Sequence, residues 1–429
     1  MVRKEQSVPH TKGHLDLVLQ DVRKKYGDQA LMTGEEFLKK NPRRYISTGC
    51  FAIDAALGGG IPVGVISEIF GSPGSGKTTL ACHVVANSLK RDQDAVAFYL
   101  LTEGDYPYEA VSLFGIPQDR FYVILQREHG ERTLGVLFDT LNKMRPHLEC
   151  GDLKLGALVF DSVAGLLPSQ DIEGIEKDGF DKQSIGTHAR LMSTMLRRFG
   201  GSGLFRYSPV IFLNQTRNVV STVPLPPDST GGNAVKFWSK LRMKLQTSSS
   251  RKVLARDIRA MAAIPGIHVP AEDKVQVGHE VDLEISKNNT GFGFPGARTT
   301  YRVIYGYGYD NYTSVLNEAI ASGLVRLSGN TCSWRDVRVV GRNNFLAQLV
   351  SMDRWNELEQ EVRQLIFHKQ GPVQLVSLKR DGEDISSAQE GLEELTDPAA
   401  ATDDEGDISA ALGDILAEEF QSIITPDGI

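Results

Sequence analysis

Residues 66–79 read ISEIFGSPGSGKTT, an apolar run followed at once by a glycine-rich turn that ends in Lys77 and Thr78. The turn fits the pattern G-x-x-x-x-G-K-S/T, and residues 80–89 continue it with a helix-forming run. Glycines let backbone N–H groups face phosphate oxygens, and the positive end of the next helix favours an anion. The stretch predicts a nucleotide-binding strand, loop and helix. The alternative is a glycine-rich turn that keeps the pattern without the ligand.

The residues of this loop are expected to divide the task of holding a nucleotide and its metal. Lys77 would reach the β and γ phosphates, and the Thr78 hydroxyl would ligate Mg²⁺. The predicted cofactors are therefore ATP and Mg²⁺. The expected phosphate-binding residues are Gly71, Ser72, Pro73, Gly74, Ser75, Gly76, Lys77, Thr78 and Thr79.

Two carboxylates follow apolar runs further along the chain. Asp161 ends the run at residues 157–161, and Glu103 follows the run at residues 95–101. In a parallel sheet both would stand at the carboxyl edge, where ligands bind. Asp161 would then hold the metal, and Glu103 would orient and activate the attacking water. Taken alone, Asp161 could be an ordinary strand exit and Glu103 a surface residue, but the upstream loop favours the catalytic interpretation.

Apolar runs and helical stretches alternate from residue 45 onward. The runs lie at residues 65–70, 96–101, 157–161 and 210–214. This alternation predicts an α/β fold with a mainly parallel sheet covered by helices. Strand-like segments at residues 241–246, 281–287 and 300–305 follow without long helices, so the sheet is expected to finish with antiparallel strands. The polar, basic stretch at residues 248–280 is interpreted as a hairpin extension or a mobile loop.

Length and composition set the outer limits of the interpretation. The chain has 429 residues, 41% hydrophobic and 24% charged, and we find no apolar run of membrane-spanning length and no apolar leader. We therefore expect a cytoplasmic protein without a membrane partner. The four cysteines lie far apart without a C-x-x-C pair, which predicts reduced packing thiols rather than a zinc or disulfide framework.

The net charge of −7 is unevenly distributed. Residues 381–429 carry 15 acidic and no basic side chains, which leaves 47 basic against 39 acidic residues in positions 1–380. A basic body suits a polyanion, and an acidic tail could compete with that polyanion for the same surface. A solvated tail that only aids solubility is the alternative.

Four parts are expected along the chain. They are an N-terminal helical module at residues 1–44, a nucleotide-binding core at 45–310, a small α+β domain at 311–375 and an acidic, disordered tail at 376–429. The helix of the first part is expected within residues 15–25.

Several segments together resemble the RecA family of recombinases, in the family's order. They include residues 46–62 ahead of the phosphate loop, Glu103, and the strand end at residues 161–164. Residues 212–217 and 230–237 then bracket a segment similar to the family's second DNA-binding loop. The resemblance implies a RecA-type P-loop ATPase and DNA-binding core at residues 45–310. It also implies that the helical module at 1–44 serves oligomerisation and that residues 311–375 form the family's small C-terminal domain.

The resemblance also assigns roles around the nucleotide. The implied catalytic residues are Glu103, Lys77, Gln215 and Lys287, with Gln215 as the sensor of the γ-phosphate. Asp105 and Tyr108 are similar to the family's adenine contacts, although their spacing from Glu103 is shorter here. Lys236, Phe237 and Arg242 match residues at the interface where neighbouring protomers enclose ATP. Where the family has Lys-Asn-Lys, this chain has Lys287-Asn288-Asn289, so one cation of that interface is absent from the motif.

The same comparison with the family implies contacts to DNA. The expected residues are Arg190, Arg217, Asn218, Val219, Val220, Gly231, Gly232 and Asn233. Arginines and glycine N–H groups suit phosphates, and the apolar residues suit wedging between bases. Met192, Met195 and Leu196 beside Arg190 are expected to be helix core.

The implied function is ATP-dependent strand exchange by a homo-oligomeric helical filament on single-stranded DNA, paired with homologous double-stranded DNA. A mediator or a single-strand-binding protein is a further candidate partner. Two alternatives stay open: another ATPase of the superfamily, such as a ring helicase, and an ATP-gated DNA-binding filament with little hydrolysis, to which Asn289 points.

Overall fold

A computed structural model of the chain describes residues 10–27, 30–40, 43–103, 106–171, 186–203, 206, 208–217, 228–229, 232–264, 266–291 and 293–368. The expected acidic tail and most of both expected DNA loops lie outside these residues.

The centre of the molecule is a ten-stranded sheet. Its strands, in spatial order, are β12 (Gly308–Tyr309), β11 (Arg298–Ile304), β10 (Gln276–Asn288), β9 (Ser239–Leu254), β3 (Ile66–Gly71), β7 (Val210–Arg217), β6 (Lys154–Asp161), β4 (Ala95–Leu101) and β5 (Phe121–Leu125), with β8 (Asp228–Ser229) paired to β7. The pairs from β9 through β3 to β5 are parallel, and the pairs from β9 to β12 are antiparallel. The predicted α/β class, with terminal antiparallel strands, is confirmed.

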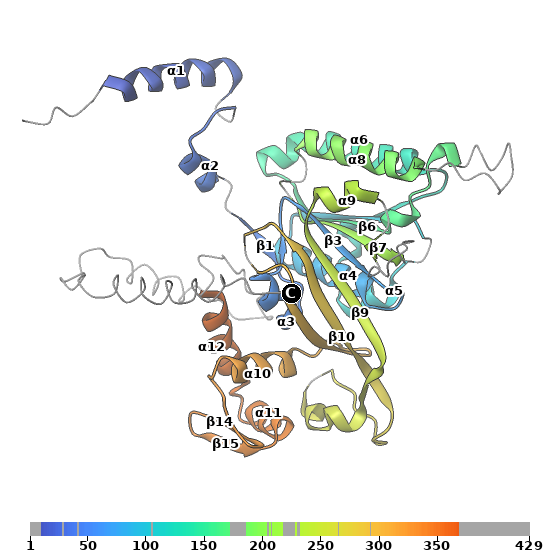
Figure 1. Cartoon of the computed structure of the whole chain (residues 1–429), viewed down its shortest axis with the longest axis vertical. Coiled ribbons are helices and arrows are strands. Elements are labelled where there is room, and N and C mark those ends of the chain that lie inside the picture. The colour runs from blue at the N-terminus through green and yellow to red at the C-terminus, as the bar shows by residue number, and fades with distance from the viewer. Residues whose placement is uncertain are drawn as a thin grey trace, which may run out of the picture. The chain divides into compact units, whose positions relative to one another are not determined.

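Helices cover both faces of the parallel part of this sheet. Successive residues of a strand face opposite sides of the sheet, so neighbouring residues pack against different helices. Val159 belongs to the hydrophobic cluster that includes α4 (Lys77–Arg91), whereas Phe160 belongs to the cluster that includes α6 (Gly130–Cys150) and α8 (Thr187–Ser202). The two helices α6 and α8 run side by side on that second face (Figure 1). The expected core residues Met192, Met195 and Leu196 are buried in the same cluster, which confirms that prediction.

Strands β9 and β10 continue beyond the sheet as a long hairpin (Figure 1). The 3-10 helix η4 (Ala255–Ala263) lies between them, so the described residues of the stretch at 248–280 form a hairpin extension with a helical end. Ile258 and Met261 of η4 are buried in one hydrophobic cluster with Phe345 and Leu349. The insertion is therefore part of a core, which its polar composition did not suggest.

The C-terminal segment supplies most of the other members of this cluster, which also includes Phe51 and Ile304. It comprises α10 (Asn311–Ala321), β13 (Arg326–Ser328), β14 (Thr331–Trp334), β15 (Val337–Val340), α11 (Arg342–Ser351) and α12 (Trp355–His368). We refer to the shared core of η4 and this segment as the C-terminal cluster. The predicted domain boundaries at residues 44, 310 and 375 stay predictions.

The remaining elements are short or lie near the N-terminus. They are α1 (His10–Tyr26), α2 (Gly34–Lys40), β1 (Tyr45–Ile46), α3 (Phe51–Leu57), β2 (Ile61–Pro62), α5 (Tyr108–Leu113), η1 (Gln118–Arg120), η2 (Val163–Gly165) and α9 (Gly232–Trp238). Helix α1 contains the helix expected at residues 15–25, and Leu17 on it is 60% exposed. No helix within the described ranges combines the length and apolar character needed to cross a membrane.

The cysteines are all free, as expected. Cys50, Cys82 and Cys332 are buried, which confirms the interpretation as packing thiols for these three. That interpretation is wrong for Cys150, which is exposed at the end of α6.

Candidate nucleotide-binding and catalytic site

The phosphate loop leaves β3 at Gly71 and enters α4 at Lys77. A Cβ atom at Gly71 would lie 2.2 Å from the carbonyl oxygen of Leu245, so no larger residue fits there without moving the neighbouring strand. Gly74 and Gly76 have φ angles of +72° and +84°, which favour glycine even though space around them is open. The loop is thus a tight turn that depends on glycine at these three positions.

The polar atoms within the loop suit an anionic ligand. The Lys77 ammonium donates to the carbonyl oxygens of Gly71 and Ser72, at 3.1 and 2.8 Å. Burial lowers the pKa of Lys77, while the nearby charges of Asp161 and Glu103 oppose that shift. The Ser75 hydroxyl is buried and has no hydrogen-bond partner among the described residues. A phosphate oxygen would satisfy both the hydroxyl and the ammonium, so the loop fits the predicted nucleotide.

The two expected metal ligands lie together. The Thr78 hydroxyl donates to Oδ2 of Asp161 at 2.9 Å, and the Tyr99 hydroxyl donates to the same oxygen. Burial raises the pKa of Asp161, although the hydrogen bonds from Tyr99 and Thr78 lower it. Hydroxyl and carboxylate oxygens side by side are ligands that suit Mg²⁺, often through water. Sequence reasoning missed Tyr99; its signal was a hydroxyl group inside an otherwise apolar strand.

Glu103 lies beside Gln215, although 112 residues separate them in the sequence. Nε2 of Gln215 donates to Oε1 of Glu103 at 2.8 Å, and the Ser162 hydroxyl donates to the same oxygen. Ser162 is itself fixed by Thr102, whose hydroxyl oxygen accepts the Ser162 N–H at 2.9 Å. One carboxylate oxygen is thus oriented by two neutral donors from neighbouring strand ends. The sequence analysis did not predict this contact between Ser162 and Glu103.

A buried ion pair lies beneath this edge of the sheet. Nε of Arg242 contacts Oε2 of Glu68 at 2.6 Å, and the Glu68 side chain is fully buried. Asn214 donates to the other Glu68 oxygen at 2.8 Å, and Arg242 also donates to the Ser229 hydroxyl at 2.9 Å. Arg242 was expected at an interface between protomers, but its side chain is only 11% exposed. Arg242 thus joins β9 to Glu68 of β3 and to Ser229 of β8.

The other expected interface residues stand near the end of α9. The Lys287 ammonium donates to the carbonyl oxygens of Lys236 and Phe237, at 2.8 and 3.2 Å. Burial lowers the pKa of Lys287, and the charges of Lys240 and Arg242 act in the same direction. The Phe237 side chain is 77% exposed. Lys287 therefore stabilises the carboxyl end of α9 within its own chain.

The expected adenine contact Tyr108 is 70% exposed at the start of α5. Its ring meets the ring of Tyr106 edge to face, with centroids 4.6 Å apart. Tyr106 was not predicted; it is half-buried against the hydrophobic core, so Tyr108 carries the exposed ring of the pair. Asp105 lies outside the described residues.

The expected DNA contacts are only partly described. Arg217 ends β7, and its backbone pairs with Asp228 of β8, so the two ends of the loop at residues 218–227 meet. Arg190 is exposed on α8 and lines a shallow hollow with Arg197. Gly232 and Asn233 begin α9. Four of the predicted contacts lie outside the described residues: Asn218, Val219, Val220 and Gly231.

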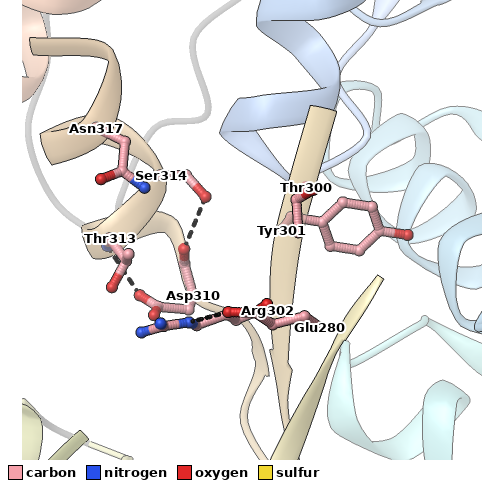
Figure 2. Close-up of a pocket in the computed structure, with 8 residues that line it drawn as sticks. All are labelled: Glu280, Thr300, Tyr301, Arg302, Asp310, Thr313, Ser314 and Asn317. Atoms are coloured by element: carbon pink, nitrogen blue, oxygen red, sulfur yellow. Dashed lines mark hydrogen bonds and ion pairs between the residues drawn. The ribbon is translucent and has the colours of Figure 1, made fainter. Parts of the chain in front are cut away.

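A separate cavity of about 180 Å³ lies between β10, β11 and α10 (Figure 2). The Asp310 carboxylate caps α10 by accepting the Thr313 N–H at 2.9 Å, and Arg302 pairs with Glu280 at 3.1 Å. The Tyr301 ring points away from the other lining residues. These groups stabilise the start of a helix and a strand pair, and no residue of the phosphate loop lines the cavity.

Comparison with known proteins gives one consistent result. The protein-family model of the RecA N-terminal domain matches residues 13–309 of this chain. Protein RecA of Mycoplasmopsis pulmonis is 33% identical over 356 residues, which cover 82% of this chain and 93% of that protein. Protein RecA of Mycolicibacterium vanbaalenii is 30% identical over 367 residues, 84% of this chain and 93% of the relative. For Protein RecA of Ruegeria pomeroyi the identity is 32% over 335 residues, with 77% and 85% covered.

Proposed function

The chain belongs to the RecA family, and we propose that it is a DNA-dependent ATPase that forms helical filaments on single-stranded DNA and exchanges strands with homologous duplex. The observation that carries this proposal is the meeting of three groups at one sheet edge: Lys77 in its loop, the Thr78–Asp161 pair, and Glu103 held by Gln215. Lys77 follows β3, Asp161 ends β6 and Glu103 follows β4, so these three residues come from the carboxyl ends of different strands, where ligands of parallel sheets bind.

In the proposed mechanism the loop N–H groups and Lys77 bind the phosphates, and Thr78 and Asp161 hold Mg²⁺. Bound Mg²⁺ would neutralise charge on the β and γ phosphates. Glu103 accepts the proton of the attacking water at Oε1 or Oε2, and Ser162 keeps the carboxylate in position. The Gln215 amide and the Ser162 hydroxyl both donate to Oε1 of Glu103 and so orient the carboxylate for this step.

Gln215 connects this chemistry to the DNA side of the molecule. Its amide reaches Glu103, and its strand pairs through Thr216 and Arg217 with β8 at the far end of the loop at 218–227. A bound γ-phosphate that drew the Gln215 amide away from Glu103 would shift the end of β7. The loop at residues 218–227 begins there, so its position would change as well. In this way ATP binding would favour the DNA-bound form, and hydrolysis would release it.

In this proposal the homologous sequence is recognised by base pairing between the DNA strands. The protein therefore needs only contacts to the DNA backbone and surfaces on which bases can stack. Arg190, Arg217 and the loop between β7 and β8 would supply them. The basic balance of positions 1–380 supports a polyanionic partner.

The test is strand exchange between circular single-stranded DNA and homologous linear duplex, in the presence of ATP and Mg²⁺. The wild-type protein should convert the duplex into joint molecules and products, whereas Lys77→Ala should not. Lys90→Ala is the matched control, because Lys90 lies exposed at the other end of the same helix. Efficient exchange by Lys77→Ala would falsify the proposal.

A second candidate is an ATP-gated filament with little hydrolysis. It is favoured by the contacts of Lys287, whose ammonium is engaged with the end of α9, together with asparagine at position 289. Filaments seen by negative-stain microscopy with background turnover would support this candidate. Closed rings with unwinding activity would instead support a helicase.

A further inference from the structure

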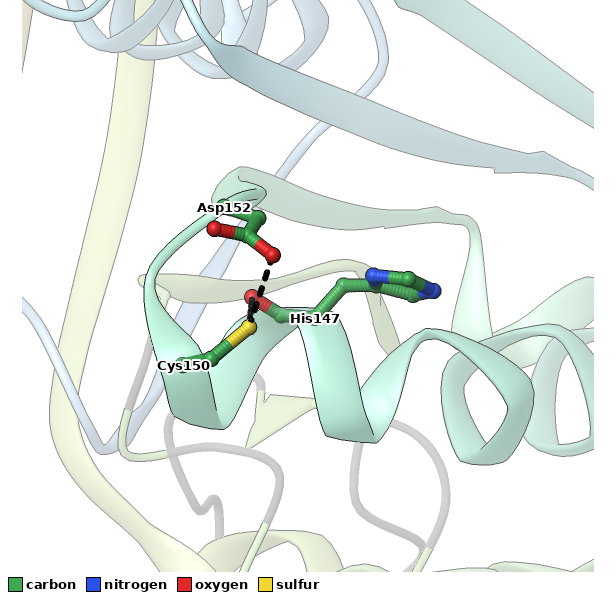
Figure 3. Close-up of side chains that lie close together, drawn as sticks. All are labelled: His147, Cys150 and Asp152. Atoms are coloured by element: carbon green, nitrogen blue, oxygen red, sulfur yellow. Dashed lines mark hydrogen bonds between the residues drawn. The ribbon is translucent and has the colours of Figure 1, made fainter.

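Three side chains with different metal-binding atoms gather at the carboxyl end of α6 (Figure 3). One ligand atom from each of His147, Cys150 and Asp152 lies within 4.8 Å of the other two. The Cys150 thiol already donates to Oδ2 of Asp152 at 3.1 Å. Across the described ranges, this is the only group of three His, Cys, Asp or Glu side chains that meets so closely.

The helix end fixes the backbone of this cluster. Gly151 adopts φ +87° directly after α6, and the His147 carbonyl oxygen accepts the N–H groups of Gly151 and Leu153, both at 3.1 Å. This left-handed turn reverses the chain and brings Asp152 back beside Cys150. Only side-chain rotations are needed to bring the three ligand atoms together, so little backbone ordering opposes ion binding.

We propose that His147, Cys150 and Asp152 form a surface site for a transition-metal ion of the zinc class. Thiolate, imidazole and carboxylate are the ligands that Zn²⁺ takes, whereas Mg²⁺ and Ca²⁺ prefer oxygen alone. Bonds of about 2.0–2.3 Å place tetrahedral ligands roughly 3.5 Å apart, so the Cys150–Asp152 pair is already close and the exposed imidazole must move by about 1 Å. The partial negative charge at the carboxyl end of α6 favours a cation.

The cluster is distinct from the predicted Mg²⁺ site. It precedes β6 at the amino edge of the parallel strands, whereas Asp161 ends β6 at the carboxyl edge. Strand β6 has 8 residues, and at roughly 3.3 Å per residue the two sites are separated by the strand's length. Three protein ligands leave a fourth tetrahedral position open to water, as in a zinc site that is not closed.

The chain offers a selective readout of this site, because Cys150 is the exposed thiol among its four cysteines. Cys50, Cys82 and Cys332 are buried, and burial raises the pKa of all three thiols, to about 12 for Cys82. Ellman's reagent should therefore react first with Cys150 in the folded full-length protein. The thiolate is both the reacting nucleophile and the metal ligand, so zinc bound to Cys150 should slow this reaction.

The experiment measures the initial rate of that reaction with and without ZnCl₂, in the absence of nucleotide. Wild type should be protected, and His147→Ala and Asp152→Asn should each need at least about tenfold more zinc for equal protection. His268→Ala is the matched control, because His268 is exposed on the β9–β10 insertion and outside the cluster. Its protection should equal that of wild type.

Cobalt binding gives an independent signature. Co²⁺ should produce a thiolate-to-cobalt charge-transfer band in wild type that is lost in Cys150→Ser, while circular dichroism confirms that each variant is folded. A Cys150 rate that zinc leaves unchanged would overturn the proposal, and so would equal protection in His147→Ala and wild type.

Discussion

The carboxyl edge of the parallel strands and the C-terminal cluster treat charged residues in opposite ways. At the edge, Lys77, Asp161 and Glu103 are held by carbonyl, hydroxyl and amide groups, and within the described residues none of them forms an ion pair. Around the C-terminal cluster, arginines pair with carboxylates at the surface, as Arg354 does with Asp336 at 2.7 Å.

The difference separates a site from a scaffold. Charges held by neutral groups keep their electrostatic potential for a ligand, whereas paired charges have already been neutralised by the protein. The interior of the C-terminal cluster is correspondingly apolar, with Ile258 and Phe345 fully buried. Substitutions at the edge should therefore change chemistry, and substitutions in the cluster should change stability.

The largest effect is expected at Glu103. Glu103→Gln keeps the shape of the side chain and removes the base, so DNA-stimulated ATP turnover should fall about 10²- to 10⁴-fold. Binding of a fluorescent ATP analogue should stay within a few-fold of wild type. Glu109→Gln is the control, because the Glu109 side chain is exposed on α5. If Glu103→Gln retained full turnover, the edge would not be the site of chemistry that the comparison takes it to be.

The Glu68–Arg242 pair sharpens the comparison, because it lies beneath the edge and yet belongs to the scaffold. Glu68→Gln removes the fully buried carboxylate that pairs with Arg242 and should lower the free energy of unfolding by about 3–5 kcal/mol. Urea denaturation measures this loss. The control is Glu284→Gln, whose partner Arg298 is 75% exposed and whose loss should cost at most about 1 kcal/mol. Equal costs for the two variants would remove the distinction between buried and surface pairs.

Ile258→Ala tests the scaffold side directly. Ile258 is fully buried in the C-terminal cluster, so its truncation should lower the free energy of unfolding by about 2–5 kcal/mol. Nucleotide affinity of the folded protein should stay unchanged. A large loss of nucleotide affinity without a loss of stability would show that the insertion serves the site instead.

The smallest effect concerns pH. His83 on α4 is stacked between Phe114 and Tyr309, with ring centroids 4.1 and 5.1 Å away, and burial lowers its pKa to about 4. In the unfolded chain the His83 imidazole has a pKa of about 6.5, so it binds a proton more readily there than in the folded protein. Stability from neutral His83 should therefore be present above pH 6.5 and be lost as the pH falls towards 4, by up to about 3 kcal/mol.

The measurement compares wild type with His83→Gln by urea denaturation between pH 7 and pH 4. Subtracting the two curves cancels the carboxylates, which titrate in both proteins. The wild-type stability should fall more steeply than that of the variant. Parallel curves would mean that His83 does not titrate in this range.

Much of the edge could be predicted from sequence, because the ends of parallel strands meet wherever the alternation of strands and helices is clear. That rule brought Lys77, Asp161 and Glu103 to one place before any contact was known, and the family resemblance added Gln215. The pair of Glu68 with Arg242 could not be predicted in the same way, because 174 residues separate them. The available signal was a glutamate within an apolar strand, which implies a buried partner but does not name it.

The composition of the insertion at residues 248–280 did not indicate that it contributes to the C-terminal cluster. Its arginines suggested a surface loop, and Arg259 does contact Asp273 and two backbone carbonyls at the surface. The apolar residues of the insertion, such as Ile258 and Met261, share a buried cluster with Phe345 and Leu349, about 90 residues later. Contacts between distant segments depend on the tertiary fold, and local periodicity carries no information about them.

The central claim is that the carboxyl edge hydrolyses ATP in response to DNA. Its most direct test is steady-state ATP hydrolysis by the full-length protein, with and without single-stranded DNA, for wild type, Lys77→Ala and Lys90→Ala. The account predicts strong stimulation by DNA in wild type and Lys90→Ala, and background turnover in Lys77→Ala under both conditions. Turnover that DNA does not stimulate, or that survives the loss of Lys77, would contradict it.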